Sequence, residues 1–248
     1  MGFEHATRAA KGARSYQEDA AEVREDAGEL TAVLADGMGG HVGGAMASRL
    51  ACMFFLQAFA MSSARDVRPR LGEALDVANE AIAQETDKDP SLTGMGCTLV
   101  GATFGPSGLE WVSVGDSPLF LVRKGEIVLL NEDHSLAPEI DKLAERGKIS
   151  WDEARADPRR HVLRSALTGA EIDMVDRSQR PLALQPGDAV ILASDGIHSI
   201  SRADIARVVA GANTSDAAAE ALLAAVEAAG DAYQDNTTVV VVRVPEDL

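Results

Sequence analysis

The chain has 248 residues, of which 46% are hydrophobic and 25% are charged, and its formal net charge is −16. Such a composition is typical of a soluble globular protein with a sizeable core, and it excludes an intrinsically disordered chain. The acidic balance argues against a general nucleic-acid binder and against a protein of anionic membrane surfaces, since both need the opposite charge. We therefore expect a single domain over residues 1–248, with no nucleic-acid and no membrane partner.

Strand and helix patterns follow one another without a linker or an internal repeat. In chain order we predict a strand at 30–35, helices at 44–60 and 67–86, strands at 97–104, 109–114, 119–123 and 127–130, helices at 138–146 and 151–156, a strand at 189–193, helices at 203–210 and 216–229, and a strand at 238–244. Turn residues at 105–108 and 124–125 indicate antiparallel neighbours. Ser150 and Ser201 each precede an acidic residue by three positions, which predicts that they begin helices.

Several of these strands are almost continuously apolar, which is typical of strands buried on both faces. Antiparallel strands are buried on both faces when two sheets pack together and helices cover the outside. We therefore predict an α+β fold, a four-layer αββα sandwich of two mostly antiparallel sheets flanked by helices. The segment 136–171 is polar, charged and interrupted by Pro158, so we expect it on the surface near a site.

Two features of the sequence bear on the cellular compartment of the protein. The first residues contain no apolar core of a secretory signal, and no apolar run reaches membrane-spanning length. Cys52 and Cys97 lie in apolar surroundings, and their number and spacing fit neither a disulfide framework nor a zinc site. Two buried free thiols in a reducing compartment are the simplest interpretation. We expect a cytoplasmic protein.

Four aspartates lie at the ends of short apolar runs, beside glycine, asparagine or polar turn residues: Asp19, Asp36, Asp195 and Asp235. Strand ends of this kind lie exposed at the rim of a sheet. Several such rims brought together would form a pocket of oxygen atoms that repel one another unless cations fill it. The pattern therefore predicts a site for more than one hard divalent ion.

Each motif alone also has a simpler explanation. The glycine-rich run at 36–41 could be a plain turn from strand to helix, and it is not a nucleotide cradle, because Val42 occupies a required glycine position and the Walker lysine is absent. Arg14, beside Glu18 and Asp19, could form a surface salt bridge. Asp116, in Gly-Asp-Ser, could belong only to a turn.

Taken in order, however, the motifs resemble the PP2C family of metal-dependent protein serine/threonine phosphatases, in its compact bacterial form. The resemblance runs from residue 12 to residue 238. It consists of RxxxED at 14–19, DGMGGH at 36–41, GMGCT at 94–98, GDS at 115–117, DHS at 133–135, RSALTG at 164–169, SDG at 194–196 and DNTT at 235–238. The joint pattern is specific although its pieces are not.

The resemblance implies a centre of two metal ions, Mg²⁺ or Mn²⁺, at one end of the sandwich. Asp36 would bridge the ions, the carbonyl of Gly37 would bind one of them, and Asp195 and Asp235 would hold the other. Asp19 is a further candidate ligand. All-oxygen ligation independently favours Mg²⁺ or Mn²⁺ over zinc.

The resemblance also implies supporting residues. Arg14 would grip the substrate phosphate, for which its planar guanidinium is suited. Glu18 and Asn236 would support the ligands from behind, and Asp116 with Asp195 matches a third, weaker metal site of bacterial members. Residues 136–171 would form the variable flap, and we expect its basic residues to influence substrate preference.

Three positions depart from the family pattern. Gln17 replaces a common asparagine, Pro118 follows GDS where arginine is usual, and Met38 stands where eukaryotic members carry a histidine proposed as the leaving-group acid. Pro118 bears on the setting of Asp116, and Met38 leaves the general acid unassigned; His41 is one alternative.

The implied activity is hydrolysis of phosphoserine and phosphothreonine in proteins by a metal-activated water, without a phosphoenzyme. The implied partners are phosphorylated proteins, such as those of a bacterial Ser/Thr kinase. Three alternatives stay open: a non-catalytic pseudophosphatase scaffold, a dedicated regulatory phosphatase acting on one small phosphoprotein, and a metal-binding α/β domain of another use.

Overall fold

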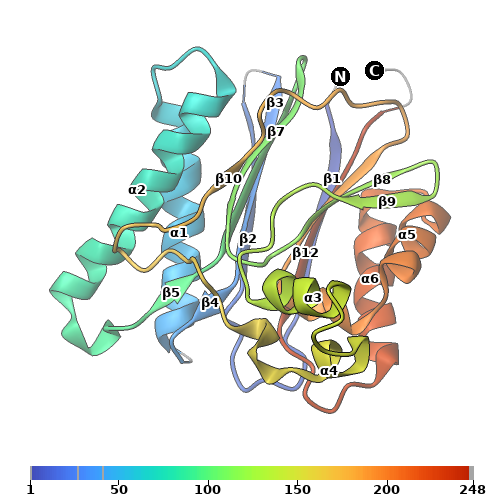
Figure 1. The fold of residues 1–248 in the computed structure, drawn as a ribbon. Helices are drawn as coiled ribbons and strands as arrows, with labels where there is room; N and C mark the ends of the chain where they lie inside the picture. Colours follow the sequence, from blue (N-terminus) through green and yellow to red (C-terminus); the bar gives the residue numbers. More distant parts are fainter. Residues whose placement is uncertain (1, 27, 41, 246–248) are drawn as a thin grey trace.

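The computed structural model describes residues 2–26, 28–40 and 42–245 (Figure 1). One five-stranded sheet contains, in spatial order, β1 (Glu4–Ala10), β12 (Thr237–Arg243), β11 (Ala189–Ala193), β8 (Leu119–Arg123) and β9 (Glu126–Leu129). The other contains β10 (Asp176–Arg177), β7 (Gly108–Val114), β6 (Leu99–Gly105), β3 (Glu29–Ala35) and β2 (Ala20–Asp26). A small ribbon pairs β4 (Gly37–Met38) with β5 (Gly96–Cys97). All these pairs are antiparallel.

Helices cover both outer faces of the sheet pair. The α-helices are α1 (Val42–Met61), α2 (Val67–Lys88), α3 (Ala137–Glu145), α4 (Trp151–Ala156), α5 (Arg202–Gly211) and α6 (Ser215–Ala229), and the 3₁₀ turns are η1 (Pro90–Leu92), η2 (Pro158–His161) and η3 (Asp195–Ser199). Figure 1 shows α1 and α2 on one side of the two sheets and α5 and α6 on the other. The predicted αββα sandwich is confirmed.

The core has three apolar layers, and β3 explains why its sequence lacks polar residues. Val33 and Ala35 pack outward under α1 and α2, whereas Ala32 and Leu34 point inward against the other sheet. Because both faces of the strand are buried, alternation disappears. The same reasoning holds for β12, whose valines are divided between the inner layer and the layer under α5 and α6.

The predicted elements are present with ends shifted by at most two residues, except for the strand at 97–104, and the two-residue strands β4 and β10 were not predicted. The edge strands β1 and β2 were not predicted, because their half-exposed sequences carry charged residues at several positions. The strand predicted at 97–104 is interrupted at Thr98, which separates β5 from β6. Both helix caps are confirmed, since Ser150 and Ser201 accept hydrogen bonds from the backbone of Glu153 and Asp204.

Helix α1 differs from the expectation about membrane-spanning segments. With 20 residues and a mean hydropathy of 1.3, it is long and apolar enough to cross a membrane by length and composition alone. It nevertheless contributes residues such as Phe55 and Cys52 to the core under the second sheet, and 56% of its apolar window is buried. We interpret α1 as a core helix.

The arrangement of the strands sets the position of the site. Glu4 at the start of β1 is paired with Arg243 at the end of β12, so both ends of the described chain lie at one end of the sandwich. The connections that carry the motif aspartates lie at the opposite end, where α3 and α4 also lie in Figure 1.

Candidate functional site

Five carboxylates from five separate connections meet at this end of the sandwich. Asp19 precedes β2, Asp36 follows β3, Asp116 lies between β7 and β8, Asp195 follows β11 and Asp235 precedes β12. The carboxylate of Asp36 interacts electrostatically with all four others. The structure therefore brings together every acidic residue that the sequence singled out as a metal ligand.

Burial and mutual repulsion disfavour the charged forms of these groups. Burial, followed by the charges of Asp195 and Asp235, raises the pKa of Asp19 to about 6, although a hydrogen bond from Ser194 opposes the shift. Burial, followed by repulsion from Asp195, raises the pKa of Asp116 to about 7. The pKa values of Asp36 and Asp195 are also raised, again chiefly by burial. This is the electrostatic signature of a site that attracts cations.

The donor atoms fit hard divalent ions. Asp19 Oδ1 and Asp195 Oδ1 are buried and accept no hydrogen bond among the described residues. Asp36 is hydrogen-bonded to Asp195, which requires a proton on one of the two carboxyl groups, and Asp235 is paired with Arg14. Within the described ranges, no group of three or more His, Cys, Asp or Glu side chains is arranged as a preformed metal site. Divalent ions would supply the compensation that the two unbonded oxygens lack.

Close backbone packing explains the glycines of the 36–41 motif. A Cβ on Gly37 would lie 2.2 Å from the carbonyl oxygen of Gly44 and 2.5 Å from that of Glu18, so no side chain fits there. A Cβ on Gly44 would in turn lie 2.1 Å from Glu18 Oε2. The first turn of α1 is thus pressed against the connection that carries Glu18. His41, the alternative general acid, lies outside the described residues.

Asn236 holds the loop that carries Arg14 and Glu18. Its Nδ2 donates hydrogen bonds to the carbonyl oxygens of Lys11, at 2.8 Å, and Tyr16, at 2.9 Å, and its Oδ1 accepts one from the backbone N–H of Glu18, at 2.8 Å. Asn236 is 4% exposed. Its position agrees with a supporting role behind the acidic groups.

The acidic groups open into a hollow of about 810 Å³. Of the predicted site residues, all except Asp19 line it; Asp19 lies buried below the surface of the hollow. The guanidinium of Arg14 pairs with Asp235, which is 221 residues away in the sequence. The opposite wall is formed by residues of the 163–173 segment, among them Arg164.

Three residues near the acids were not singled out from the sequence. Thr98 Oγ1 accepts a hydrogen bond from the backbone N–H of Asp36 at 3.0 Å, and Ser194 Oγ donates to Asp19 Oδ2 at 2.7 Å. His161 lines the hollow, and its charge lowers the pKa of Asp195. Thr98 ends one quoted motif and Ser194 begins another, whereas His161 belongs to no motif.

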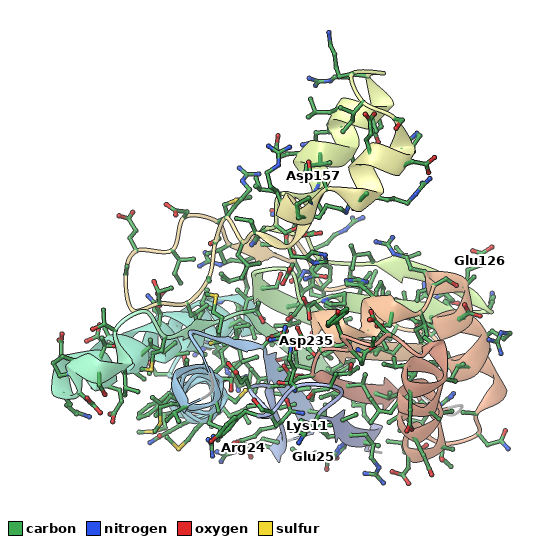
Figure 2. All side chains as sticks on the ribbon, turned by 90° about the horizontal axis from the view of Figure 1, so that it is seen from below. Lys11, Arg24, Glu25, Glu126, Asp157 and Asp235 are labelled. Carbon is green, nitrogen blue, oxygen red and sulfur yellow. The ribbon has the colours of Figure 1, made fainter. Side chains whose placement is uncertain are left out.

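The flap forms a separate unit above the hollow. Figure 2 shows its helical part, labelled at Asp157, rising from the body of the molecule, with Asp235 lying below it. Ile140, Ala144 and Ala154 form its own small apolar core. Two flap arginines form ion pairs inside the flap: Arg160 pairs with Asp141, and Arg159 pairs with Asp157.

Comparison with known proteins gives consistent matches over most of the chain. The family model described as Protein phosphatase 2C matches residues 8–234. Serine/threonine phosphatase stp of Listeria innocua is 31% identical over 236 residues, which cover 93% of this chain and 91% of the relative. Serine/threonine protein phosphatase PstP of Mycobacterium tuberculosis is 34% identical over 171 residues, 69% of this chain. The match spans only 32% of the length of PstP.

Solved structures of PstP agree with the fold. The crystal structure of the Mycobacterium tuberculosis serine/threonine phosphatase PstP/Ppp superimposes with a TM-score of 0.82 at 30% identity, covering 99% of this chain and all of that chain. The catalytic domain of PstP in complex with two manganese ions gives a TM-score of 0.78 at 30% identity, covering 98% of each chain.

Proposed function

This chain belongs to the protein phosphatase 2C family of metal-dependent protein serine/threonine phosphatases, and we propose that it hydrolyses phosphoserine and phosphothreonine in proteins without a phosphoenzyme. The observation that carries the proposal is that four of the five clustered carboxylates and the guanidinium of Arg14 line one hollow, with the carboxylate of Asp19 buried beside them. Among the described residues, two of these carboxylate oxygens, Asp19 Oδ1 and Asp195 Oδ1, have no donor. Bound cations would relieve the repulsion within such a group of like charges, and a guanidinium beside cations suits a phosphate.

The metal-holding residues follow from the chemistry of the donors. Asp36, the carbonyl of Gly37, Asp195 and Asp235 would hold two divalent ions, Mg²⁺ or Mn²⁺, with Asp36 as the central carboxylate because it interacts with the others. Asp19, hydrogen-bonded to Ser194, is either a ligand or a support for one. When bound, two divalent ions would lower the pKa of a water molecule and draw negative charge from the phosphoryl oxygens.

Substrate phosphate is held by Arg14. Its side chain is 58% exposed and lines the hollow, where the guanidinium pairs with Asp235. Once Asp235 serves as a ligand, the planar fork of Arg14 is available for phosphate oxygens. Met38 also lines the hollow and offers no proton to a leaving serine or threonine oxygen.

A direct assay separates the enzyme from a pseudophosphatase scaffold. The purified chain with Mn²⁺ is expected to release phosphate from p-nitrophenyl phosphate and from phosphoserine and phosphothreonine peptides, and EDTA should abolish the release. Asp36→Asn serves as the control for contaminating phosphatases. Turnover no higher than that of the Asp36→Asn protein would favour the scaffold.

The substrates belong to the same proposal. We infer that they are cytoplasmic proteins phosphorylated by a bacterial Ser/Thr kinase, which is supported by the kinship with PstP and stp and by the buried free thiols Cys52 and Cys97. Comparing the phosphoproteomes of cells with and without the protein shows whether it acts on many phosphoproteins or on one. Many phosphosites rising together would indicate a general kinase antagonist, whereas one site would indicate a dedicated regulatory phosphatase.

A further inference from the structure

His134, in the middle of the DHS motif, has no part in the proposed chemistry, yet it is only 1% exposed. It makes a closed pair of hydrogen bonds with Gly115. The backbone N–H of His134 donates to the carbonyl oxygen of Gly115 at 3.1 Å, and the backbone N–H of Gly115 donates to His134 Nδ1 at 3.2 Å. An imidazole nitrogen that accepts a hydrogen bond carries no proton, so the proton of the neutral ring is on Nε2.

Gly115 immediately precedes Asp116, so this bond pair fixes the start of the turn that carries that carboxylate. The turn has little freedom to adjust by itself. Gly115 has a φ of +100°, and a Cβ there would lie 2.6 Å from Thr98 Cγ2. The backbone of Gly115 therefore lies close against Thr98, whose hydroxyl accepts a hydrogen bond from the backbone of Asp36.

Asn131 holds the other side of the same turn. Its Nδ2 donates to the carbonyl oxygen of Ser117 at 2.9 Å, and its Oδ1 accepts from the backbone N–H of Leu119 at 2.8 Å. Both Asn131 and His134 are buried. The segment 131–134 therefore encloses the Asp116 turn from both ends.

The same histidine also touches the flap where the chain returns from it. Its carbonyl oxygen accepts a hydrogen bond from the backbone N–H of Arg164 at 2.8 Å. The next residues continue the contact, because Ser135 bridges Leu163 and the N–H of Leu136 donates to the carbonyl oxygen of Val162 at 2.9 Å. Within the part of the chain that the structure describes, the side chain of Asn131 bonds to Ser113, Ser117 and Leu119 and not to the flap, so Asn131 provides a matched comparison.

We propose that His134 is a positioning residue that couples the flap to Asp116, through its unprotonated Nδ1 on Gly115 and its carbonyl oxygen on Arg164. A change in the position of the flap then alters the direction of the Asp116 carboxylate. Conversely, metal binding near Asp116 alters the position of the flap. The proposal depends on the phosphatase function only where activity is measured.

The test removes or restores the hydrogen-bond acceptor that His134 Nδ1 provides to Gly115. His134→Leu keeps the approximate bulk and removes the acceptor, whereas His134→Asn places Oδ1 at the same number of bonds from the backbone as Nδ1. We expect His134→Leu to weaken the weakest Mn²⁺ binding step in calorimetry about tenfold, the scale of one buried hydrogen bond. It should also accelerate tryptic cleavage at Arg146 and Lys148 in the flap. His134→Asn should return both measurements to within about twofold of wild type.

Two controls separate coupling from general damage. Asn131→Leu should weaken the same Mn²⁺ step without accelerating flap cleavage. In an Asp116→Ala background, His134→Leu should cause no further change in Mn²⁺ binding, because its target is already gone. Equal behaviour of the Leu and Asn variants, unchanged Mn²⁺ binding in His134→Leu, or additive effects with Asp116→Ala would each overturn the proposal.

A measurement on the wild-type protein covers the case in which His134→Leu does not fold. Nitrogen-15 spectra of the histidine rings in the Mg²⁺-loaded protein report which ring nitrogen carries the proton. A neutral His134 with its proton on Nε2 supports the proposal, and a protonated Nδ1 contradicts it. This result, like the calorimetry and proteolysis, stands even if no phosphatase activity is found.

Discussion

The acidic floor of the hollow, formed by the five carboxylates, and the flap above it satisfy their charges in opposite ways. In the floor, burial and repulsion raise the pKa values of Asp19, Asp36, Asp116 and Asp195, and two carboxylate oxygens have no donor. In the flap, Asp157 pairs with Arg159, which holds its pKa down to about 2, and Asp141 pairs with Arg160. These flap carboxylates are compensated by arginines of the flap itself, whereas the carboxylates of the floor repel one another.

This difference indicates where binding energy can come from. Cations added to the floor relieve repulsion that the fold has built in, so the floor is suited to metal and phosphate chemistry. In the flap, Arg155, Arg159, Arg160 and Arg164 already have carboxylate partners, so an added charge at these positions relieves no repulsion. We therefore expect the paired arginines to influence substrates through the position of the flap and not as free positive charges.

The largest expected effect is that of Asp36→Asn. The substitution removes the charge that interacts with all the other carboxylates, so Mn²⁺-dependent turnover should fall by about 10³-fold or more. Calorimetry should show loss of the tight Mn²⁺ binding at the same time. Wild-type turnover at saturating Mn²⁺ would contradict the assignment of the floor as a metal site.

Arg14→Ala should have the next largest effect. We expect kcat/KM for a phosphopeptide to fall about 100-fold, with kcat falling as KM rises, because part of the phosphate contact exists only in the transition state. Tight Mn²⁺ binding should persist or strengthen, since Arg14 competes for Asp235. Unchanged kinetics would mean that the Arg14–Asp235 pair is purely structural.

Asp116→Ala should lower kcat about tenfold and move the Mn²⁺ dependence to higher concentration. An ion with fewer protein ligands is held more weakly, and the tight ions on Asp36, Asp195 and Asp235 should stay bound. Pro118 does not displace the turn from the acids, because Asp116 still interacts with Asp195. Full activity with an unchanged Mn²⁺ titration would show that Asp116 is only a turn residue.

Substitutions of flap arginines should affect activity through the hydrogen bonds that hold the flap together. Arg160 donates to Asp141 on α3 and to the carbonyl oxygen of Ala154 on α4, whereas Arg159 pairs only with Asp157 nearby. Arg160→Ala should therefore lower phosphoprotein hydrolysis about threefold, a typical value for one partly buried pair, and leave p-nitrophenyl phosphate hydrolysis unchanged. Arg159→Ala is the control and should change neither. Equal losses on both substrates would place Arg160 in the chemistry.

The smallest effect concerns stability without metal. Burial and Asp195 raise the folded-state pKa of Asp116 from 3.8 to about 7, so its contribution to stability is present at low pH and is lost as pH rises through that value. In EDTA, Asp116→Asn should therefore raise Tm by about 2–4 °C at about pH 8 and by less at about pH 5. Saturating Mn²⁺ should abolish this gain. A gain equal at both pH values would mean that Asp116 ionises normally.

The sequence by itself determined the layers of the fold and the members of the floor. Continuous apolar runs such as β3 and β12 arise only where both faces are buried, and turn residues fixed the hairpins. Asp36, Asp195 and Asp235 were identifiable because acids recur at the ends of apolar runs, and because the motifs that contain them resemble one family when taken in order. The edge strands β1 and β2 escaped prediction, because half-exposed strands tolerate charges.

Only the tertiary structure decided which residues of the site and of the flap pair with one another. Arg14 bonds Asp235 across a separation of 221 residues, Asn236 holds the backbone of Glu18, and His134 joins Gly115 to Arg164. No local pattern encodes these pairs, because they depend on which connections of two packed sheets meet at the same end of the sandwich. The charges of the flap arginines were legible in the sequence, but their neutralisation by Asp141 and Asp157 follows from the folding of the flap on itself.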